Sequence, residues 1–164
     1  MSKQKQKKSS VLTGYGKTAG MLVIAGAVVL GSVLPSLLRT AKAADVVVYK
    51  SETCGCCKKW VSHLEKNGFR VETHDKRNLR QIKAEMGVPN HLHSCHTAKV
   101  GDYIVEGHVP AKEILRLLTE KPQVKGLAVP GMPMGSPGME GPRKDSYDIL
   151  TFEESGKTSV FASR

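Results

Sequence analysis

Acidic residues are absent from the first 43 residues of this 164-residue chain, although the whole chain has 15 of them. The same stretch carries seven of the 25 basic residues, and no charged residue lies between Ala19 and Leu38. A basic start, an apolar stretch and the small-residue sequence Ala41-Lys42-Ala43 are typical of a secretory signal peptide. We therefore expect a Sec-type signal over 1–43, cleavage after Ala43 and a mature chain of residues 44–164.

Two further absences bear on the route of export. No cysteine stands near the cleavage site, which argues against lipoprotein attachment, and no Arg-Arg pair points to the twin-arginine route. The uncharged stretch is 20 residues long, enough to span a bilayer, so an uncleaved N-terminal anchor stays open. Pro35 and Ser36 interrupt the stretch and favour a cleaved signal. We expect a periplasmic protein that meets the membrane only if this segment is retained.

The excess of positive charge lies in the leader. The chain has a net charge of +10, but residues 44–164 carry 18 basic and 15 acidic residues, which leaves +3. No basic stripe interleaved with aromatic residues remains, so nothing supports binding to nucleic acid. The basic run Lys76-Arg77, Arg80 and Lys83 is expected to be the solvated face of a helix. The mature length predicts one domain with a modest core.

Hydrophobic periodicity predicts the order β-α-β-α-β-β-α for most of the mature chain. This order matches a thioredoxin-like α/β fold, in which a cysteine turn stands between the first strand and the first helix. A ferredoxin-like metal-binding domain, β-α-β-β-α-β, is the alternative, but it lacks the extra helix that this chain has before the hairpin. The predicted strands are Val46–Lys50, Phe69–Thr73, Cys95–Val100 and Tyr103–His108, and the predicted helices begin after Ser51 or Thr53, at Asn78 and at Pro110.

A segment rich in glycine, proline and methionine follows the predicted third helix. Gly126–Gly141 contains five glycines, three prolines and three methionines in sixteen residues. This composition predicts a loop that forms neither a helix nor a central strand. The segments Tyr147–Phe152 and Thr158–Phe161 predict a C-terminal β-hairpin, which would pin the far end of the loop.

All four cysteines lie in the mature part, where an oxidising compartment requires a disulfide, a redox pair or a metal site. Cys54-Gly55-Cys56-Cys57 opens a predicted helix, whose N-terminus lowers the pKa of nearby thiols. The spacing of Cys54 and Cys57 is typical of a redox pair with an exposed attacking thiol and a resolving thiol that faces the core. Cys56 is an additional thiol, which suits multi-thiolate metal binding better than disulfide exchange.

A second cluster of metal-binding residue types surrounds the fourth cysteine, in His91-Leu92-His93-Ser94-Cys95-His96. In a thioredoxin-like arrangement the segment that enters the third strand lies against the cysteine turn, so Cys95 and His96 can reach it. Period-two spacing places His91 and His93 on the same side as Cys95. The other predictions are a cap or ligand role for His108 and surface positions for His63 and His74.

The methionines of the glycine-rich segment are the third group of candidates. Met132, Met134 and Met139 lie in a loop that has no core face to fill. Thiolate, thioether and imidazole together select Cu(I), or else zinc, over hard cations. Zinc fits a site of cysteines and histidines, but a zinc site would not explain the methionines. In that case the methionines would be incidental.

Four motifs carry a resemblance to a known family. They are Cys54-Gly-Cys-Cys57, Ser94-Cys-His-Thr97, Glu106-Gly-His-Val-Pro110, and the segment from Gly126-Leu-Ala-Val-Pro-Gly-Met-Pro to Gly135-Ser-Pro-Gly-Met-Glu140. Together they resemble the exported metal-binding family of the bacterial copper-resistance protein CopG, over residues 45–163. The resemblance implies a periplasmic copper-binding protein of thioredoxin-like fold. The ligands it implies are Cys54, Cys56, Cys57, Cys95, His96, His108 and Met132, with Met139 as a secondary one.

Three hypotheses for function follow. The first is a copper-binding protein of resistance or homeostasis, which binds one or more Cu(I) ions, cycles copper between oxidation states or passes it to other periplasmic copper-handling proteins. The second is a thiol–disulfide oxidoreductase with Cys54 as attacking and Cys57 as resolving thiol, so enzymatic activity stays open. The third is a structural module with two disulfides, Cys54 with Cys57 and Cys56 with Cys95.

Overall fold

The computed structural model describes residues 45–164, and the predicted signal segment 1–43 lies outside the described residues. The elements in chain order are β1 (Val46–Lys50), α1 (Gly55–Lys66), β2 (Val71–Asp75), α2 (Leu79–Glu85), the short 3₁₀ helix η2 (Asn90–Leu92), β3 (His96–Val100), β4 (Tyr103–Glu106), α3 (Ala111–Glu120), β5 (Gly126–Ala128), β6 (Asp148–Phe152) and β7 (Thr158–Ser163). Among these residues no helix is long and apolar enough to cross a membrane.

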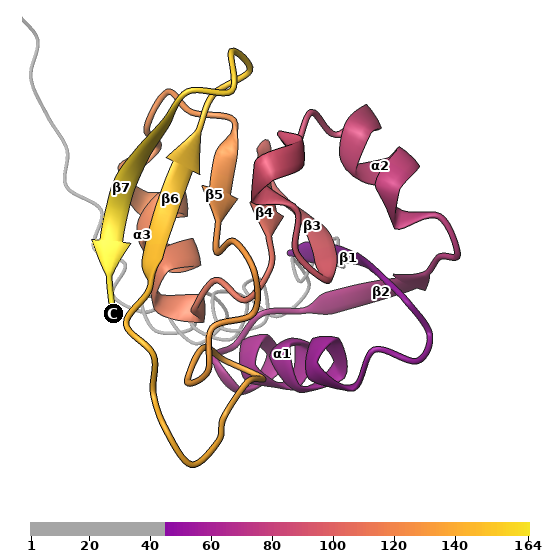
Figure 1. Ribbon diagram of the computed structural model, residues 1–164. Helices are drawn as coiled ribbons and strands as arrows, with labels where there is room; N and C mark the ends of the chain where they lie inside the picture. The colour runs from indigo at the N-terminus through magenta and orange to yellow at the C-terminus, as the bar shows by residue number, and fades with distance from the viewer. Residues whose placement is uncertain (1–44) are drawn as a thin grey trace, which may run out of the picture. The chain divides into compact units, whose positions relative to one another are not determined.

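Within residues 45–164 the seven strands form one sheet in the order β2-β1-β3-β4-β5-β6-β7 (Figure 1). β1 and β2 are parallel and are joined by α1, whereas β3 is antiparallel to both β1 and β4. β5 is parallel to β4, and β6 and β7 form the C-terminal hairpin. The predicted α/β class, element order and hairpin are confirmed. The ferredoxin-like alternative is wrong because α2 stands between β2 and β3, and the thioredoxin-like label stays a prediction.

One face of α1 is buried in the core. Cys57, Trp60 and Leu64 are fully buried and Val61 nearly so. The indole N–H of Trp60 donates to the carbonyl oxygen of Val109 at 2.8 Å, so this large side chain is buried without an unpaired donor. Burying each large apolar side chain stabilises the fold by roughly 1.5–3 kcal/mol. The first turn of α1, with its cysteines, is therefore fixed against the sheet.

The prediction that the glycine-rich segment contains no central strand is wrong. Gly126–Ala128 forms β5, which is buried between β4 and β6. A Cβ atom on Gly126 would clash with the carbonyl oxygen of Ile104, so a glycine is required where β5 comes this close to β4. A strand of three residues is too short to show the alternation by which longer strands are found in a sequence.

Smaller corrections concern the element ends and one charge. β3 begins at His96 rather than at Cys95, β4 ends at Glu106, and Pro110 is the N-cap of α3 rather than its first residue. The prediction that Lys83 lies on a solvated helix face is wrong, because Lys83 is only 3% exposed. Its amino group is paired with groups on β3 and β4, and helical periodicity carries no information about partners on other elements.

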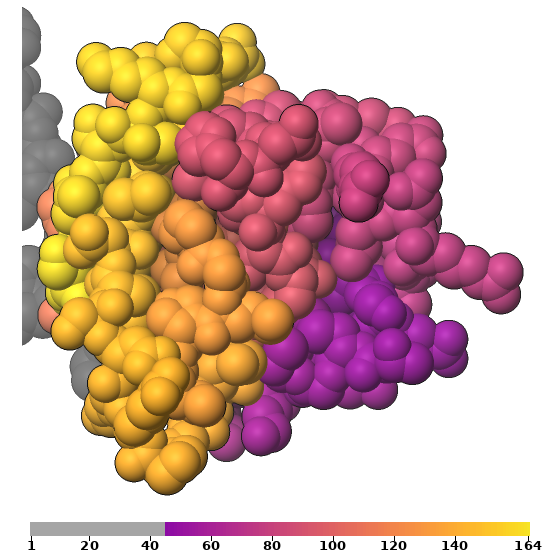
Figure 2. Space-filling view, viewed as in Figure 1, coloured from indigo at the N-terminus to yellow at the C-terminus, as the bar shows by residue number. Residues whose placement is uncertain are grey.

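The segment between β5 and β6, residues 129–147, is here called the methionine loop, and it runs beside α1 (Figures 1 and 2). Its turns are held by backbone hydrogen bonds, for example from Gly135 N to Met139 O at 2.8 Å and from Asp145 N to Met134 O at 2.9 Å. Gly138 lies so close to α1 that a Cβ atom there would be 2.6 Å from the carbonyl oxygen of Cys56. The loop therefore has a fixed path over the first turn of α1.

Candidate metal centre

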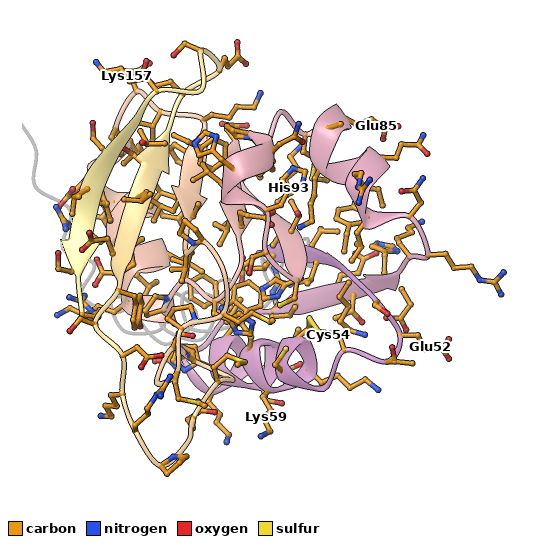
Figure 3. All side chains as sticks on the ribbon, viewed as in Figure 1. Glu52, Cys54, Lys59, Glu85, His93 and Lys157 are labelled. Atoms are coloured by element: carbon orange, nitrogen blue, oxygen red, sulfur yellow. A yellow bond between two sulfur atoms is a disulfide. The ribbon has the colours of Figure 1, made fainter. Side chains whose placement is uncertain are left out.

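The cysteine turn forms the N-terminus of α1. Cys54 is the N-cap residue, and its Sγ accepts a hydrogen bond from the backbone N–H of Cys57 at 3.3 Å. Cys54 and Cys57 form a disulfide. Cys57 is fully buried and Cys54 half-buried, which confirms the predicted inward position of Cys57. In Figure 3, Cys54 lies at the start of α1, whereas Lys59 points away from the sheet.

The two free thiols stand next to this disulfide. Cys56 Sγ lies 3.5 Å from Cys54 Sγ and 3.9 Å from Cys95 Sγ, although Cys95 is 39 residues further along the chain. Cys57 Sγ lies 3.8 Å from the carbonyl oxygen of Cys95. The prediction that Cys95 reaches the cysteine turn is confirmed, and all four sulfur atoms lie within 4.8 Å of one another.

Two imidazoles meet Cys95 from its other side. Cys95 Sγ is 2.9 Å from Nε2 of His108 and 3.3 Å from Nδ1 of His96. Nδ1 of His108 lies 2.7 Å from the carbonyl oxygen of Pro137, to which it can only donate, so Nε2 is the unprotonated nitrogen that faces Cys95. A histidine whose second nitrogen donates to a backbone carbonyl is a typical metal ligand, since its tautomer and ring orientation are fixed.

Burial determines the protonation state of these groups. Desolvation lowers the pKa of His108, and it lowers the pKa of His96 further still, with the neighbouring His108 and Lys83 acting in the same direction. Both imidazoles are therefore neutral at neutral pH, the form that binds metal ions. Burial, with a contribution from Cys56, raises the pKa of the Cys95 thiol to about 12. A metal ion that binds Cys95 must displace this proton.

The donors form two overlapping groups, and Cys95 belongs to both. One group is the four cysteines, and the other is Cys95 with His96 and His108, each with its ligand atoms within 4.8 Å. With the disulfide closed, the available donors are two thiols and two imidazoles; reduction adds two more thiols. Nε2 of His96 is buried without a hydrogen-bond partner. We call these six residues the Cys/His centre: Cys54, Cys56, Cys57, Cys95, His96 and His108.

The methionines lie in the loop that borders the Cys/His centre. Met132 is 52% exposed and follows Gly131, whose carbonyl oxygen accepts the Ser94 hydroxyl at 2.5 Å. Met139 follows Gly138, which is packed against the first turn of α1. The loop thus brings both residues into the neighbourhood of the cysteines, and metal ligation by Met132 and Met139 stays a prediction.

Three histidine predictions have different outcomes. Residues 90–92 form η2 rather than a strand, so the period-two expectation for His91 and His93 is wrong; His93 lies 3.2 Å from the carbonyl oxygen of Val88 and well apart from Cys54 in Figure 3. His63 is not a simple surface residue, because its Nε2 accepts the backbone N–H of Ala111 at 3.0 Å. His74 is partly exposed beside Glu72, as predicted.

Sequence reasoning did not identify the groups that accept hydrogen bonds from the Cys/His centre and from the backbone next to it. Glu106 is fully buried, and its carboxylate accepts the backbone N–H of Ser94, next to Cys95. A lone acidic residue at the end of the apolar run Ile104-Val105 is a signal that could have drawn attention to Glu106. The contact from Pro137 to His108 had no such signal, because it depends on the path of the methionine loop.

The fold and this centre define an α/β protein that gathers sulfur and imidazole donors at the N-terminus of a helix. A family model described as a protein of unknown function, DUF411, matches residues 92–139. No curated protein matches the chain.

Two solved structures match over most of the described chain. Copper resistance protein CopG, form 2, is 45% identical, with a TM-score of 0.71; the match covers 75% of this chain and 99% of that chain. Form 1 of the same protein is 47% identical, with a TM-score of 0.69, and the match covers 73% and 95%. The chain belongs to the family of copper resistance protein CopG.

Proposed function

We propose that the protein is a periplasmic copper-binding protein of copper resistance or homeostasis, with copper as its cargo. The observation that carries this proposal is the Cys/His centre, in which four cysteine sulfurs and two neutral imidazoles converge within the described residues. Soft donors of this kind select Cu(I) or zinc over hard cations. The relatives named as copper resistance proteins favour copper.

In the reduced state we assign Cu(I) to the four thiols, with His96 and His108 completing the ligand set. Because Cys95 belongs to both donor groups, its thiolate can bridge, so the centre suits more than one copper ion. Met132 and Met139 are proposed as further soft ligands from the methionine loop. Ligation by these methionines would favour copper over zinc, because protein zinc sites are built from cysteine, histidine and carboxylate ligands.

Anaerobic titration of the reduced protein with Cu(I), against a chromophoric competitor, tests this function. The triple variant C54S/C57S/C95S should lose most of the uptake of the wild type. A matched control, H91Q/H93Q, changes two histidines outside both donor groups and should bind as the wild type does. Equal uptake by the triple variant and the wild type would remove the proposal.

The Cys54–Cys57 disulfide favours a second candidate function, thiol–disulfide exchange. The disulfide lies at the N-terminus of α1, and Cys56 Sγ is only 3.5 Å from Cys54 Sγ. Its reduction takes up two electrons and two protons and yields the thiols of Cys54 and Cys57. Turnover of a disulfide substrate that is lost in C54S would support this function, and its absence from the wild type would exclude it.

A further inference from the structure

A buried ion pair near Cys95 joins α2 to the sheet. Lys83 is 3% exposed and Glu106, at the end of β4, is fully buried. The amino group of Lys83 lies 2.6 Å from Oε1 of Glu106 and donates to the hydroxyl of Thr97 at 2.7 Å. The Thr97 hydroxyl in turn donates to the other carboxylate oxygen of Glu106. The three side chains form a closed network between α2, β3 and β4.

The same carboxylate holds the backbone next to Cys95. The backbone N–H of Ser94 donates to Oε1 of Glu106 at 2.5 Å. On the other side of Cys95, the carbonyl oxygen of His96 accepts the N–H of Gly107 at 3.0 Å. The backbone is therefore held by hydrogen bonds on both sides of Cys95, and Glu106 accepts the one that precedes Cys95.

Stability alone does not account for a buried charge pair at this place. Removing two charges from water costs several kcal/mol for each ion, and well-packed apolar residues of similar volume often serve a fold equally well. An apolar pair at Lys83 and Glu106 could join α2 to the sheet. It could not accept the N–H of Ser94, and that contact is what the carboxylate adds.

We infer that Glu106, oriented by Lys83 and Thr97, is a positioning residue that determines where Cys95 Sγ stands in the Cys/His centre. Cys95 is shared by both donor groups, with Cys56 Sγ at 3.9 Å and His108 Nε2 at 2.9 Å. A displacement of its sulfur therefore disturbs both groups at once. The inference rests on the proposed function, because the position of Cys95 matters for metal binding. The geometry from which it is argued is that of the metal-free chain.

A matched pair of double variants separates positioning from simple stability. K83M/E106Q and K83M/E106L both remove the buried charges, but only the glutamine keeps an oxygen that accepts the Ser94 N–H. Urea unfolding, followed through the single tryptophan Trp60, identifies the variants that fold. If K83M/E106L does not fold, S94P, which removes the backbone donor together with the hydroxyl, takes its place, with S94A as the control for the lost hydroxyl.

The first measurement needs no metal. Without reductant, the free thiols are Cys56 and Cys95, and phenylarsine oxide captures two thiols only when they are close together. We expect capture in the wild type and K83M/E106Q, and its loss in folded K83M/E106L or S94P. Capture at the wild-type rate by the folded leucine variant, or by S94P in its place, would overturn the inference.

The second measurement uses Co(II), whose thiolate charge-transfer band reports a sulfur ligand. We expect the affinity of K83M/E106L, or of S94P in its place, to fall by about 10- to 100-fold, the range seen when partners of metal ligands are removed, with a weakened band. K83M/E106Q should stay close to the wild type. An unchanged affinity and band in the folded leucine variant, or in S94P, would also overturn the inference. Failure of the wild type to bind either Cu(I) or Co(II) would count against the proposed function instead, while arsenical capture would still decide the role of Glu106.

Discussion

Cys95 connects more of the Cys/His centre than any other side chain. It meets Cys56 from α1 and His108 from the segment before α3, and the backbone N–H of its neighbour Ser94 donates to Glu106. The sequence predicts that Cys95 reaches the cysteine turn, because in a thioredoxin-like arrangement the segment that enters the third strand lies against that turn. It does not predict the roles of Glu106 and Pro137, since these depend on where other elements cross the site.

The two donor groups predict different outcomes for two cysteine variants. C95S removes a ligand from both groups, so it should weaken binding of both Cu(I) and Co(II). We assign Co(II) to the group of Cys95, His96 and His108. C57S removes a ligand only from the group of four cysteines, so it should weaken Cu(I) binding and leave Co(II) affinity at or above that of the wild type. Competition titrations with each metal measure both effects. Equal loss of Co(II) binding in the two variants would contradict the division into groups.

His63 predicts a dependence of stability on pH. Burial lowers its pKa, with Lys66 acting in the same direction and Glu140 against it, and its Nε2 must be unprotonated to accept the N–H of Ala111. The unfolded chain binds the proton more readily, so the free energy of unfolding should fall as pH decreases below about 6.5. Urea unfolding of the wild type and H63Q at several pH values measures this effect.

The comparison with H63Q isolates His63, because the glutamine keeps an acceptor and does not titrate. The other histidines are present in both proteins, so the difference between the two free energies of unfolding reports His63 alone. We expect the free energy of unfolding of the wild type to fall relative to that of H63Q below about pH 6.5. A difference that stays constant from pH 5 to 8 would show that His63 does not act in this way.

At the scale of elements, length decides what the sequence can predict. α1 and α3 each show a buried face over several turns, and both are confirmed. β5 and η2 have three residues each, which is too few for a helical or a strand period to appear, so the sequence predicts neither of them. α2 was found, but its buried residue is Lys83, which no hydrophobic pattern can identify.

Contact between the methionine loop and α1 predicts unequal effects for two glycine substitutions. Gly138 and Gly131 both have a positive φ, so alanine should cost about 1–2 kcal/mol at either position. At Gly138 the new Cβ would also lie 2.6 Å from the carbonyl oxygen of Cys56, whereas Gly131 faces open space. Overpacking should add about 1–3 kcal/mol to G138A.

Chemical denaturation measures the two free energies of unfolding, and the Co(II) spectrum shows whether the centre is disturbed. We expect G138A to change the spectrum, because Gly138 also lies next to the ring of His108, and G131A to leave it as in the wild type. Equal destabilisation by the two variants would mean that the loop does not press on α1.

At the scale of the whole molecule, the centre is assembled from distant parts of one chain. The cysteine turn, the entry to β3, the segment before α3 and the methionine loop meet at one place, so ligand spacing in the sequence gives no geometry. The class of donors was predictable because cysteine, histidine and methionine gather in four motifs. The Cys54–Cys57 disulfide is among the hypotheses that the sequence supports, but the division into two donor groups depends on the three-dimensional arrangement.

Export is a prediction for the whole chain. If residues 1–43 are a cleaved signal, the protein from the periplasmic fraction of expressing cells should begin at Ala44, as N-terminal sequencing measures. The signal model predicts that an A43F variant, with a large side chain at the cleavage site, is retained with the membrane. A wild-type protein that keeps residues 1–43 and sediments with membranes would instead establish an anchor.

Metal and thiol analysis of the wild-type protein, isolated from copper-exposed cells without reductant or chelator, tests the copper proposal most directly. Metal content is measured first, and free thiols are counted after denaturation on the same sample. We predict bound copper together with free cysteine thiols of the Cys/His centre. Protein that carries no copper, with its cysteines paired as Cys54–Cys57 and Cys56–Cys95, would contradict the proposal.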